Sequence, residues 1–560
     1  MDTNELTAKI CAAASDKKAG DIITMDMRGL MNSTDYFVIC SAPTATQVRA
    51  IADNVEEKLD EAGVHYSHRE GYSDGEWILL DYGDVVVHIF RDESRAYYAL
   101  EKLLPFLDFS SPEGNEFAAD IFTRVADACK DLGLSAESMD FGLMAEDMPY
   151  SKRSSHQIMS TIIFHMNYLE NISPADFQKL HDKYNRHLID IKPYPKKFYS
   201  HEKIRVGFLS ANFRNNVVVN WSWSLLTKLD KNLFKTYCYS AGKAFDAVTG
   251  YLKSTVAWRD ISDLSDEAAA QMIRDDEIDI LFDLDGQTGG NKLKVAAYRP
   301  ATVQISGIGY MNSTGTNFID YFLSDIYCAG DESYFTEKVI KLPHSHICYE
   351  PPTKLEPAEF PPCIKNNFVT FGSFNNFAKV TDSILLAWKK ILDAVPDSRL
   401  ILKHKIFDNV DGRNFVRNRL KNFDYNLSRV EMRGFSAKNH LLEYKDVDIA
   451  LDTFPYTGGV TTCEALYMGV PVVSLYGDRH GSRFGLSILS NIGLEELAVN
   501  SYDEYINRAV MLANDWELLK ILRKNLRTMM QKSPLMDSDN YVREIEKAFI
   551  KILNDARKDN

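Results

Sequence analysis

The sequence contains no long apolar run. No window approaches the roughly 20 apolar residues that a membrane-spanning helix needs. The first residues, MDTNELTAKI, lack a basic stretch followed by an apolar one. We therefore expect no membrane contact, no secretory signal and a cytoplasmic protein. The 560 residues also show no repeat of fixed period and no low-complexity segment, which argues against a solenoid or a largely disordered chain.

Cysteine is present without the spacing that gives it a structural role. Eight cysteines are scattered along the chain, and none forms a C-x-x-C pair. This argues against a zinc site and against a disulfide framework. The 13 histidines show no ligand spacing, and we expect His344 and His346 to lie on a loop with no third ligand nearby. The sequence thus predicts no metal site.

Several motifs of common enzyme classes are missing. No G-x-S-x-G, Walker A or G-x-G-x-x-G sequence follows a predicted strand, which weakens hydrolase, NTPase and dinucleotide-binding interpretations. D-x-D patterns lie next to apolar runs at Asp283-Leu284-Asp285 and at Asp446-Val447-Asp448. Because they border apolar strands, we interpret them as helix caps or surface turns rather than metal ligands.

The charge is negative and unevenly distributed. The net charge is −15, and residues 1–110 carry about two thirds of it. An acidic module of this size repels phosphate backbones, so we expect no direct nucleic-acid binding. A basic protein partner is one interpretation of the acidic module, and a merely soluble surface is the other.

The pattern of apolar residues predicts an α/β protein of several domains. Helical and strand patterns mix in residues 1–108 and form a small α/β domain, and residues 109–200 read as a helical connector. Continuous apolar strands then alternate with helices, which is typical of parallel sheets covered on both faces. We predict two Rossmann-like halves, 201–350 and 365–557, with a ligand cleft beyond the carboxyl ends of the strands.

One stretch, LDTFPYTGGVTTCEALYMGVPVV (451–473), joins a predicted strand to a helix. Gly458 and Gly459 allow a ligand to approach the backbone, and the amides of a helix beginning near Thr461 would bind phosphate together with the hydroxyls of Thr461 and Thr462. The alternative is a capping box, with Thr461 as N-cap and Glu464 bonding back. The spacing alone leaves both open.

Lys379 follows FGSFNNFA, at another strand-to-helix turn on the same edge of the second sheet. A lysine there would neutralise a diphosphate that gains charge as its bond to a sugar breaks. The alternative is an ordinary solvated surface lysine.

Residues 203 to about 553 resemble the catalytic region of the O-linked N-acetylglucosamine transferase / SPINDLY family. The resemblance rests on KIRVGFLSANFRN, DILFDLDGQTGGN, RPATVQISGIGYMNSTG, FGSFNNFAKV, the stretch at 451–473 and DRHGSRFG. It implies the two-Rossmann GT-B fold and inverting, metal-independent transfer of a sugar to Ser or Thr of a protein acceptor. The expected donor is UDP-GlcNAc, a co-substrate, and no cofactor is implied.

The resemblance also implies roles for individual residues. Lys379 matches the lysine that contacts the donor diphosphate, and Asn376 stands where a glutamine often approaches the same group. Glu464 takes the place of an aspartate that binds the ribose. The implied nucleotide-sugar site comprises Asn376, Phe435, Ser436, Lys438, His440, Gly459, Thr461, Thr462 and Glu464.

Two positions depart from the family pattern. Relatives usually carry a histidine facing the acceptor where this chain has Asn216, and they often read GHT where this chain has Gly286-Gln287-Thr288. An amide cannot accept a proton as imidazole does. Asn216 therefore stays a candidate catalytic position, and an inactive or sensing transferase domain stays an alternative.

Residues 1 to about 104 resemble the ribosomal silencing factor family, through DKKAGDIITMDMRGL, STDYFVICSA, QVRAIADNVEEKL and DGEWILLDYGDVVVHIF. The resemblance implies binding to a protein of the large ribosomal subunit, and with it an alternative function for the chain as a ribosome-binding translational repressor. The candidate partner surface is Trp77, Leu80, Asp81 and Tyr82. Alternatively, Trp77 and Leu80 are core residues, because successive side chains of a strand point to opposite faces and one face of EWILLDY must be buried.

Overall fold

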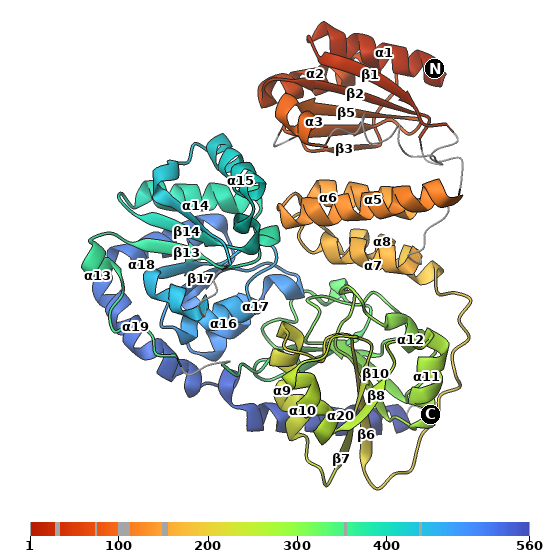
Figure 1. The fold of residues 1–560 in the computed structure, drawn as a ribbon, viewed down its shortest axis with the longest axis vertical. Helices are drawn as coiled ribbons and strands as arrows, with labels where there is room; N and C mark the ends of the chain where they lie inside the picture. The colour runs from red at the N-terminus through yellow and green to blue at the C-terminus, as the bar shows by residue number, and fades with distance from the viewer. Residues whose placement is uncertain are drawn as a thin grey trace. The chain divides into compact units, whose positions relative to one another are not determined.

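A computed structural model describes residues 2–28, 34–72, 75–98, 112–147, 155–351, 355–435 and 440–558. The chain separates into two compact units, which are described one at a time. The first consists of Met1–Ala128 and Ala136–Ile158, and the second of Cys129–Ser135 and Met159–Asn560. Figure 1 gives the labels of the main elements.

The first unit contains a mixed five-stranded sheet of order β1-β2-β5-β4-β3. β2 and β5 are parallel, and the other neighbours are antiparallel. The mixture of helices and strands predicted for residues 1–108 is present in the described part of that range. The elements are α1 (Thr3–Asp16), β1 (Gly20–Asp26), β2 (Tyr36–Ala42), α2 (Ala45–Asp60), β3 (His68–Glu70), β4 (Trp77–Asp81), β5 (Val85–Arg91), α3 (Asp92–Tyr98), α5 (Pro112–Asp131) and α6 (Ser135–Asp147).

A tight hairpin joins β4 and β5. The two strands pair antiparallel, and Oδ1 of Asp81 accepts a hydrogen bond of 2.7 Å from the amide of Gly83. Gly83 has a φ of 80°, a left-handed conformation that glycine adopts without steric cost. Asp81 and Gly83 therefore stabilise the turn together.

The second unit begins with two helices and a seven-stranded parallel sheet of order β12-β11-β10-β9-β6-β7-β8. Its elements are α7 (Ser155–Met166), α8 (Pro174–Arg186), β6 (Ile204–Ser210), α9 (Val217–Lys228), β7 (Phe234–Ser240), α10 (Ala247–Thr255), β8 (Ala257–Asp260), α11 (Asp266–Asp275), β9 (Ile280–Asp283), α12 (Leu293–Ala297), β10 (Val303–Gly307), β11 (Tyr321–Asp325) and β12 (Lys338–Leu342).

A six-stranded parallel sheet of order β15-β14-β13-β16-β17-β18 follows. Its elements are α13 (Cys363–Asn366), β13 (Thr370–Ser373), α14 (Asp382–Ala394), β14 (Arg399–Lys403), α15 (Val410–Asn422), β15 (Val430–Arg433), β16 (Ile449–Leu451), α16 (Val460–Tyr467), β17 (Val472–Leu475), α17 (Phe484–Asn491), β18 (Ala498–Val499), α18 (Tyr502–Asn514), α19 (Trp516–Gln531) and α20 (Ser538–Lys558).

The two parallel sheets confirm the α/β class and the two-Rossmann architecture. Their central strands are buried along their whole length, as the continuous apolar runs predicted. The edge strands β8 and β12 are more exposed and more polar, so periodicity did not reveal them. A 3₁₀ helix at His440–Asp446 follows β15 in the chain.

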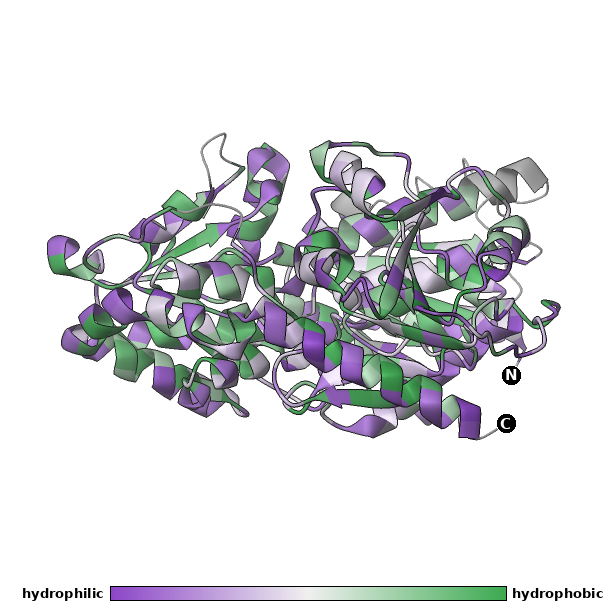
Figure 2. Ribbon diagram, turned by 90° about the horizontal axis from the view of Figure 1, so that it is seen from below, coloured by the Kyte–Doolittle hydropathy of each residue, from purple (hydrophilic) through white to green (hydrophobic). Residues whose placement is uncertain are grey.

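The last helix, α20, packs on the first of the two sheets. Its Phe549 ring lies 6.4 Å from the ring of Phe234 and 6.2 Å from that of Phe282, both edge-on. Figure 2 shows this helix, which ends at the C-terminus, with green apolar residues between purple polar ones. The half predicted as 365–557 therefore ends in a helix that covers the other half.

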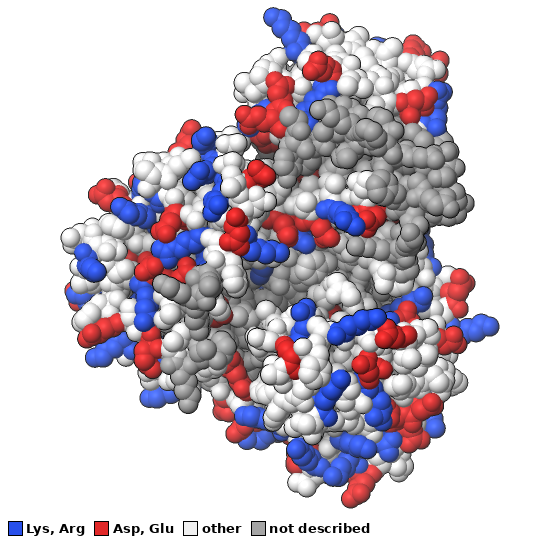
Figure 3. All heavy atoms as spheres, in the orientation of Figure 1, with Lys and Arg blue, Asp and Glu red and all other residues white. Residues whose placement is uncertain are grey.

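Acidic and basic side chains are intermixed on the visible face of the two Rossmann halves in Figure 3. Among the residues that the structure describes, no helix is both long enough and apolar enough to cross a membrane.

Candidate functional site

Lys379 lies at the end of a one-turn 3₁₀ helix that follows β13. Its Nζ donates a hydrogen bond of 2.9 Å to the carbonyl oxygen of Thr457 and sits 3.4 Å from the centroid of the Tyr456 ring. Burial lowers the pKa of Lys379 to about 7, against the opposing effect of the Asp452 carboxylate. Lys379 is therefore half-buried and bound to Thr457 and Tyr456, and it is not a solvated surface charge.

The helix α16 begins without a side-chain cap. Its N-cap residue is Gly459, and no side chain bonds to its first amides. The capping box considered for Thr461 and Glu464 is therefore absent. The Thr461 hydroxyl donates instead to Oδ1 of Asn375, at 2.6 Å, and Glu464 pairs with Nε2 of His440, at 2.7 Å. An uncapped helix start is a site where an anion binds well.

A buried carboxylate holds the glycine loop before α16. Oδ1 of Asp452 accepts from the amide of Gly458 at 2.7 Å and from Nδ2 of Asn375 at 3.2 Å. A Cβ on Gly458 would collide with Thr462 Oγ1 and would lie 2.9 Å from both Asp452 and Asn375. Glycine is thus required at 458 by close packing. At Gly459 an added Cβ would meet nothing nearer than Trp221, at 3.5 Å.

The hydroxyl of Thr462 is buried and has no hydrogen-bond partner among the described residues. A buried hydroxyl without a partner costs free energy. Together with the uncapped amides, it gives the start of α16 two unsatisfied kinds of hydrogen-bond donor.

The other predicted nucleotide-side residues surround this helix start or lie on neighbouring loops. Asn376 is exposed, and its side chain accepts from the amide of Ala378 at 3.1 Å. Phe435 is 81% exposed and follows β15. The hydrogen bond to Glu464 raises the pKa of His440. Ser436 and Lys438 lie outside the described residues.

The first half contributes α9 to the same region, since Trp221 of α9 is the nearest neighbour of the Gly459 position. Asn216 is the N-cap of α9. Its Oδ1 accepts from the amide of Val218 at 3.0 Å, and its Nδ2 donates to Asn212 at 3.1 Å. Both ends of the Asn216 amide are therefore occupied by local structure.

Asp283 and Asp285 are not surface turns, which corrects that interpretation. Both are buried at the end of β9. Asp285 accepts from Ser210 at 2.8 Å and from the amide of Ala211 at 2.6 Å. Burial, and secondarily the Asp285 charge, raise the pKa of Asp283 to about 7. The pair organises the strand ends of the first half.

Gln287 is also buried. Ser160 of α7 donates to its Oε1, and its Nε2 donates to the carbonyl of Thr314 at 2.7 Å. The amide that replaces the family's histidine thus joins α7 to the loop after β10.

In the first unit, Trp77 and Leu80 are core residues. Trp77 is buried and stacks on Phe90 at 4.7 Å between ring centroids, with Phe141 of α6 at 5.6 Å. Leu80 is fully buried. Their prediction as partner surface was wrong, and the core alternative is correct. Asp81 and Tyr82 are half-exposed, and their role stays a prediction.

Sequence reasoning missed Asn375, Asp452, Tyr456 and Thr457, which join Lys379 to the start of α16. The doubled asparagine in FGSFNNFA and the aspartate that ends the DIALD strand were the available signals. The expectation of no third ligand near His346 was also wrong, because Cys328 and His480 lie beside it.

Two family models match the chain. Glycosyl transferase family 41 matches residues 182–350 and 362–545, and the model described as ribosomal silencing factor during starvation matches residues 1–125. The fold and the site thus define a two-Rossmann glycosyltransferase with an additional N-terminal domain.

The chain belongs to glycosyl transferase family 41 and carries an N-terminal domain of the ribosomal silencing factor family. A tomato (Solanum lycopersicum) protein named probable UDP-N-acetylglucosamine--peptide N-acetylglucosaminyltransferase SPINDLY is 36% identical over 397 residues, which cover 69% of this chain and 43% of that protein. The ribosomal silencing factor RsfS of Bacillus subtilis is 47% identical over 103 residues, 18% of this chain and 87% of that protein.

The fold is similar to that of a mutant O-GlcNAc transferase of Thermobaculum terrenum, with a TM-score of 0.74, 24% identity and coverage of 99% of both chains. This likeness supports the fold alone. The chain spans less than half the length of the SPINDLY relatives that it matches.

Proposed function

We propose that the chain transfers a sugar from a nucleotide-sugar, with UDP-GlcNAc as the first candidate, to Ser or Thr hydroxyls of proteins with inversion. The proposal rests on one observation: a hydrogen bond connects the ammonium group of Lys379 to the loop that precedes the uncapped start of α16. Lys379 bonds to Thr457, two residues before the N-cap Gly459. Both would face a diphosphate leaving group and stabilise its developing charge.

The nucleotide would extend from this point across α16. We propose that Thr461 and Thr462 bind phosphate oxygens, that Glu464 and His440 bind the ribose, and that Phe435 receives the base. Asn376, Ser436 and Lys438 complete the proposed site. Lys379 and the N-terminus of α16 would neutralise the diphosphate. The proposed transfer therefore uses no metal ion there.

The N-terminal domain has a separate proposed role, which is to bind a basic protein of the large ribosomal subunit in the cytoplasm. The acidic charge of residues 1–110 supports this proposal, because opposite charges steer association. Asp81 and Tyr82 are the proposed contact residues.

The test incubates the purified full chain with a cell extract and a panel of radiolabelled nucleotide-sugars, UDP-GlcNAc first, and measures labelled protein. We expect label from one donor, and none with Lys379→Ala. UDP alone should raise the melting temperature of the wild type by mass action. No melting shift with any nucleoside diphosphate, together with no label, would contradict the transferase.

Asn216, held as a helix cap, favours a second candidate, a ribosome-binding repressor whose transferase half senses a nucleotide without turnover. A UDP-dependent melting shift without label, and co-sedimentation with large ribosomal subunits, would support it. Label without co-sedimentation would support the transferase alone.

A further inference from the structure

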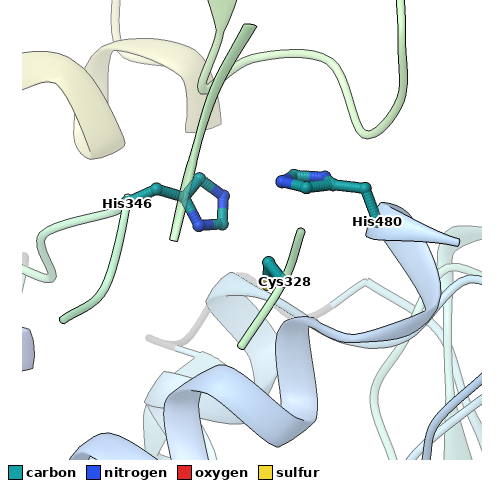
Figure 4. A group of neighbouring side chains, drawn as sticks. All are labelled: Cys328, His346 and His480. Atoms are coloured by element: carbon teal, nitrogen blue, oxygen red, sulfur yellow. The ribbon is translucent and has the colours of Figure 1, made fainter. Parts of the chain in front are cut away.

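Three side chains of types that bind metals meet in the interior of the second unit. Cys328 follows β11, His346 follows β12, and His480 follows β17. Their exposed fractions are 0%, 1% and 1%, and one ligand atom from each lies within 4.8 Å of the others. Figure 4 shows the two imidazole rings facing one another, with Cys328 beside the gap between them.

The two imidazoles are oriented by hydrogen bonds at Nδ1. His346 Nδ1 lies 2.6 Å from Oδ2 of Asp325, and His480 Nδ1 lies 3.2 Å from the carbonyl oxygen of Met311. Because a carboxylate and a carbonyl can only accept, both Nδ1 atoms are donors, and the neutral form of each ring has its lone pair on Nε2. Metal-ligating histidines are usually fixed in this way, by a carboxylate or a carbonyl on the other nitrogen.

His480 Nε2 is buried and has no hydrogen-bond partner among the described residues. A core histidine that served only packing would lose free energy by leaving this atom unsatisfied.

The Asp325 carboxylate is itself held firmly. Its Oδ1 accepts from the amide of Cys328 at 2.7 Å, and its Oδ2 accepts from the hydroxyl of Ser487 at 2.9 Å. The carboxylate therefore fixes two of the three candidate ligands, His346 through its ring and Cys328 through its backbone.

We propose that Cys328, His346 and His480 bind one Zn²⁺ ion, through Sγ and the two Nε2 atoms. One thiolate and two imidazoles are a donor set that suits zinc. Zinc–ligand bonds of about 2.0–2.3 Å in a tetrahedron would draw the three atoms to roughly 3.3–3.6 Å from one another. Side-chain rotation would supply that contraction. The fourth position is left to water. The Cys328 thiol donates to the carbonyl oxygen of Arg483 at 3.4 Å; zinc binding would replace this hydrogen bond, and the thiol proton would be released to solvent.

The proposed zinc would join the two Rossmann halves, because Cys328 and His346 come from the first and His480 from the second. The zinc site would also be connected to the candidate functional site through hydrogen bonds. The residue after His480, Gly481, accepts through its carbonyl oxygen from the amide of Thr457 at 3.1 Å, and Thr457 is the acceptor for Lys379. The zinc is thus a positioning element, and the inference does not depend on the proposed transferase function.

The test measures metal in the full chain, purified without a metal-chelating tag and also refolded from denaturant with Zn²⁺ or Co²⁺. We expect one zinc per chain, and with cobalt the intense visible bands of a tetrahedral site and a thiolate charge-transfer band. Cys328→Ser should remove the charge-transfer band, and His480→Gln should remove the bound ion. Added Zn²⁺ should raise the melting temperature of the wild type only.

Matched controls are Cys238→Ser and His181→Gln, because Cys238 is a buried cysteine and His181 a buried histidine with an unpartnered Nε2. Both should keep the metal, and near-UV circular dichroism checks that all four variants fold. A wild type that binds well below one ion per chain by both routes overturns the proposal. So does equal binding by all variants, which would indicate an adventitious ion only.

Discussion

The hydroxyl of Thr461 donates a 2.6 Å hydrogen bond to Oδ1 of Asn375, which lies 86 positions away in the sequence. Asn375 also donates to Asp452 at 3.2 Å, and the same loop leads on to Lys379. The loops after β13 and β16 are therefore fixed against each other before any ligand binds. Such preorganisation would lower the cost of ordering the proposed site when it binds a diphosphate.

The two adjacent glycines give a matched pair of variants. An added Cβ at Gly459 meets Trp221 only at 3.5 Å, so Gly459→Ala should keep the wild-type melting temperature. The methyl group would occupy the helix start, and we expect the Kd for UDP to rise at least about tenfold, or ~1.4 kcal/mol. Isothermal titration calorimetry measures this.

Gly458→Ala is the control, because its Cβ collides with Thr462 and Asp452. It should destabilise the fold by about 1–3 kcal/mol, the usual range for overpacking. Unchanged UDP affinity in Gly459→Ala would contradict the proposed phosphate position.

The lowered pKa of Lys379 predicts how UDP binding depends on pH. With a pKa near 7 in the free protein, the ammonium form is depleted as the pH rises from 7 to 9, and binding then requires proton uptake. We expect the Kd for UDP to increase up to about tenfold per pH unit in this range. Lys379→Met should bind weakly at every pH and lose the slope, and a wild-type slope in Lys379→Met would assign the dependence to another group.

The lowered pKa of Lys379 also determines whether its contribution to the free energy of unfolding rises or falls with pH. Because the folded-state pKa lies below that of the unfolded chain, the unfolded state binds more protons between pH 7 and about 10.5. The contribution of Lys379 to the free energy of unfolding therefore rises with pH across this window. Replacing it with methionine should flatten that rise.

Asn216 should act as a helix cap rather than a proton acceptor. Asn216→Ala removes the bond to the Val218 amide, and we expect a loss of about 1 kcal/mol of stability. Asn216→Asp keeps a capping oxygen and should stay near wild-type stability. Urea denaturation measures both, and a labelled-sugar assay follows turnover. A loss of turnover by orders of magnitude at unchanged stability would instead place Asn216 in the chemistry.

Phe141 is expected to stabilise the first unit, because its ring packs on Trp77 and on Phe122. Phe141→Ala should cost about 3–5 kcal/mol, as is typical for removal of a buried aromatic ring. Near-UV circular dichroism and urea denaturation of the full chain measure this. Phe435→Ala is the control, since that ring is 81% exposed and its loss should leave stability unchanged.

The sequence was sufficient for the fold and for the main loops of the site, because both follow from local patterns. Buried strands appear as apolar runs, and a strand, two glycines and a helix mark the loop before α16. The partners of the side chains were not predictable in this way. Thr461 and Glu464 have the spacing of a capping box, yet they bond to Asn375 and His440, which lie on other elements.

The same limit explains the missed cluster. Cys328, His346 and His480 have no ligand spacing in the sequence, because three different strands deliver them to one place. Trp77 and Leu80 show a related limit, since strand alternation decides which residues share a face but not whether that face is covered. In the structure α6 covers Trp77.

The return of α20 to the first sheet has a consequence for any shortened version of the chain. Deleting residues after Asp537 would leave the second half with its own strands intact, but it would strip Phe549 from Phe234 and Phe282. The damage would appear in the first Rossmann half, as an exposed sheet prone to aggregation. A tag at the carboxyl terminus would likewise adjoin the first Rossmann half, since the end of α20 lies beside β12.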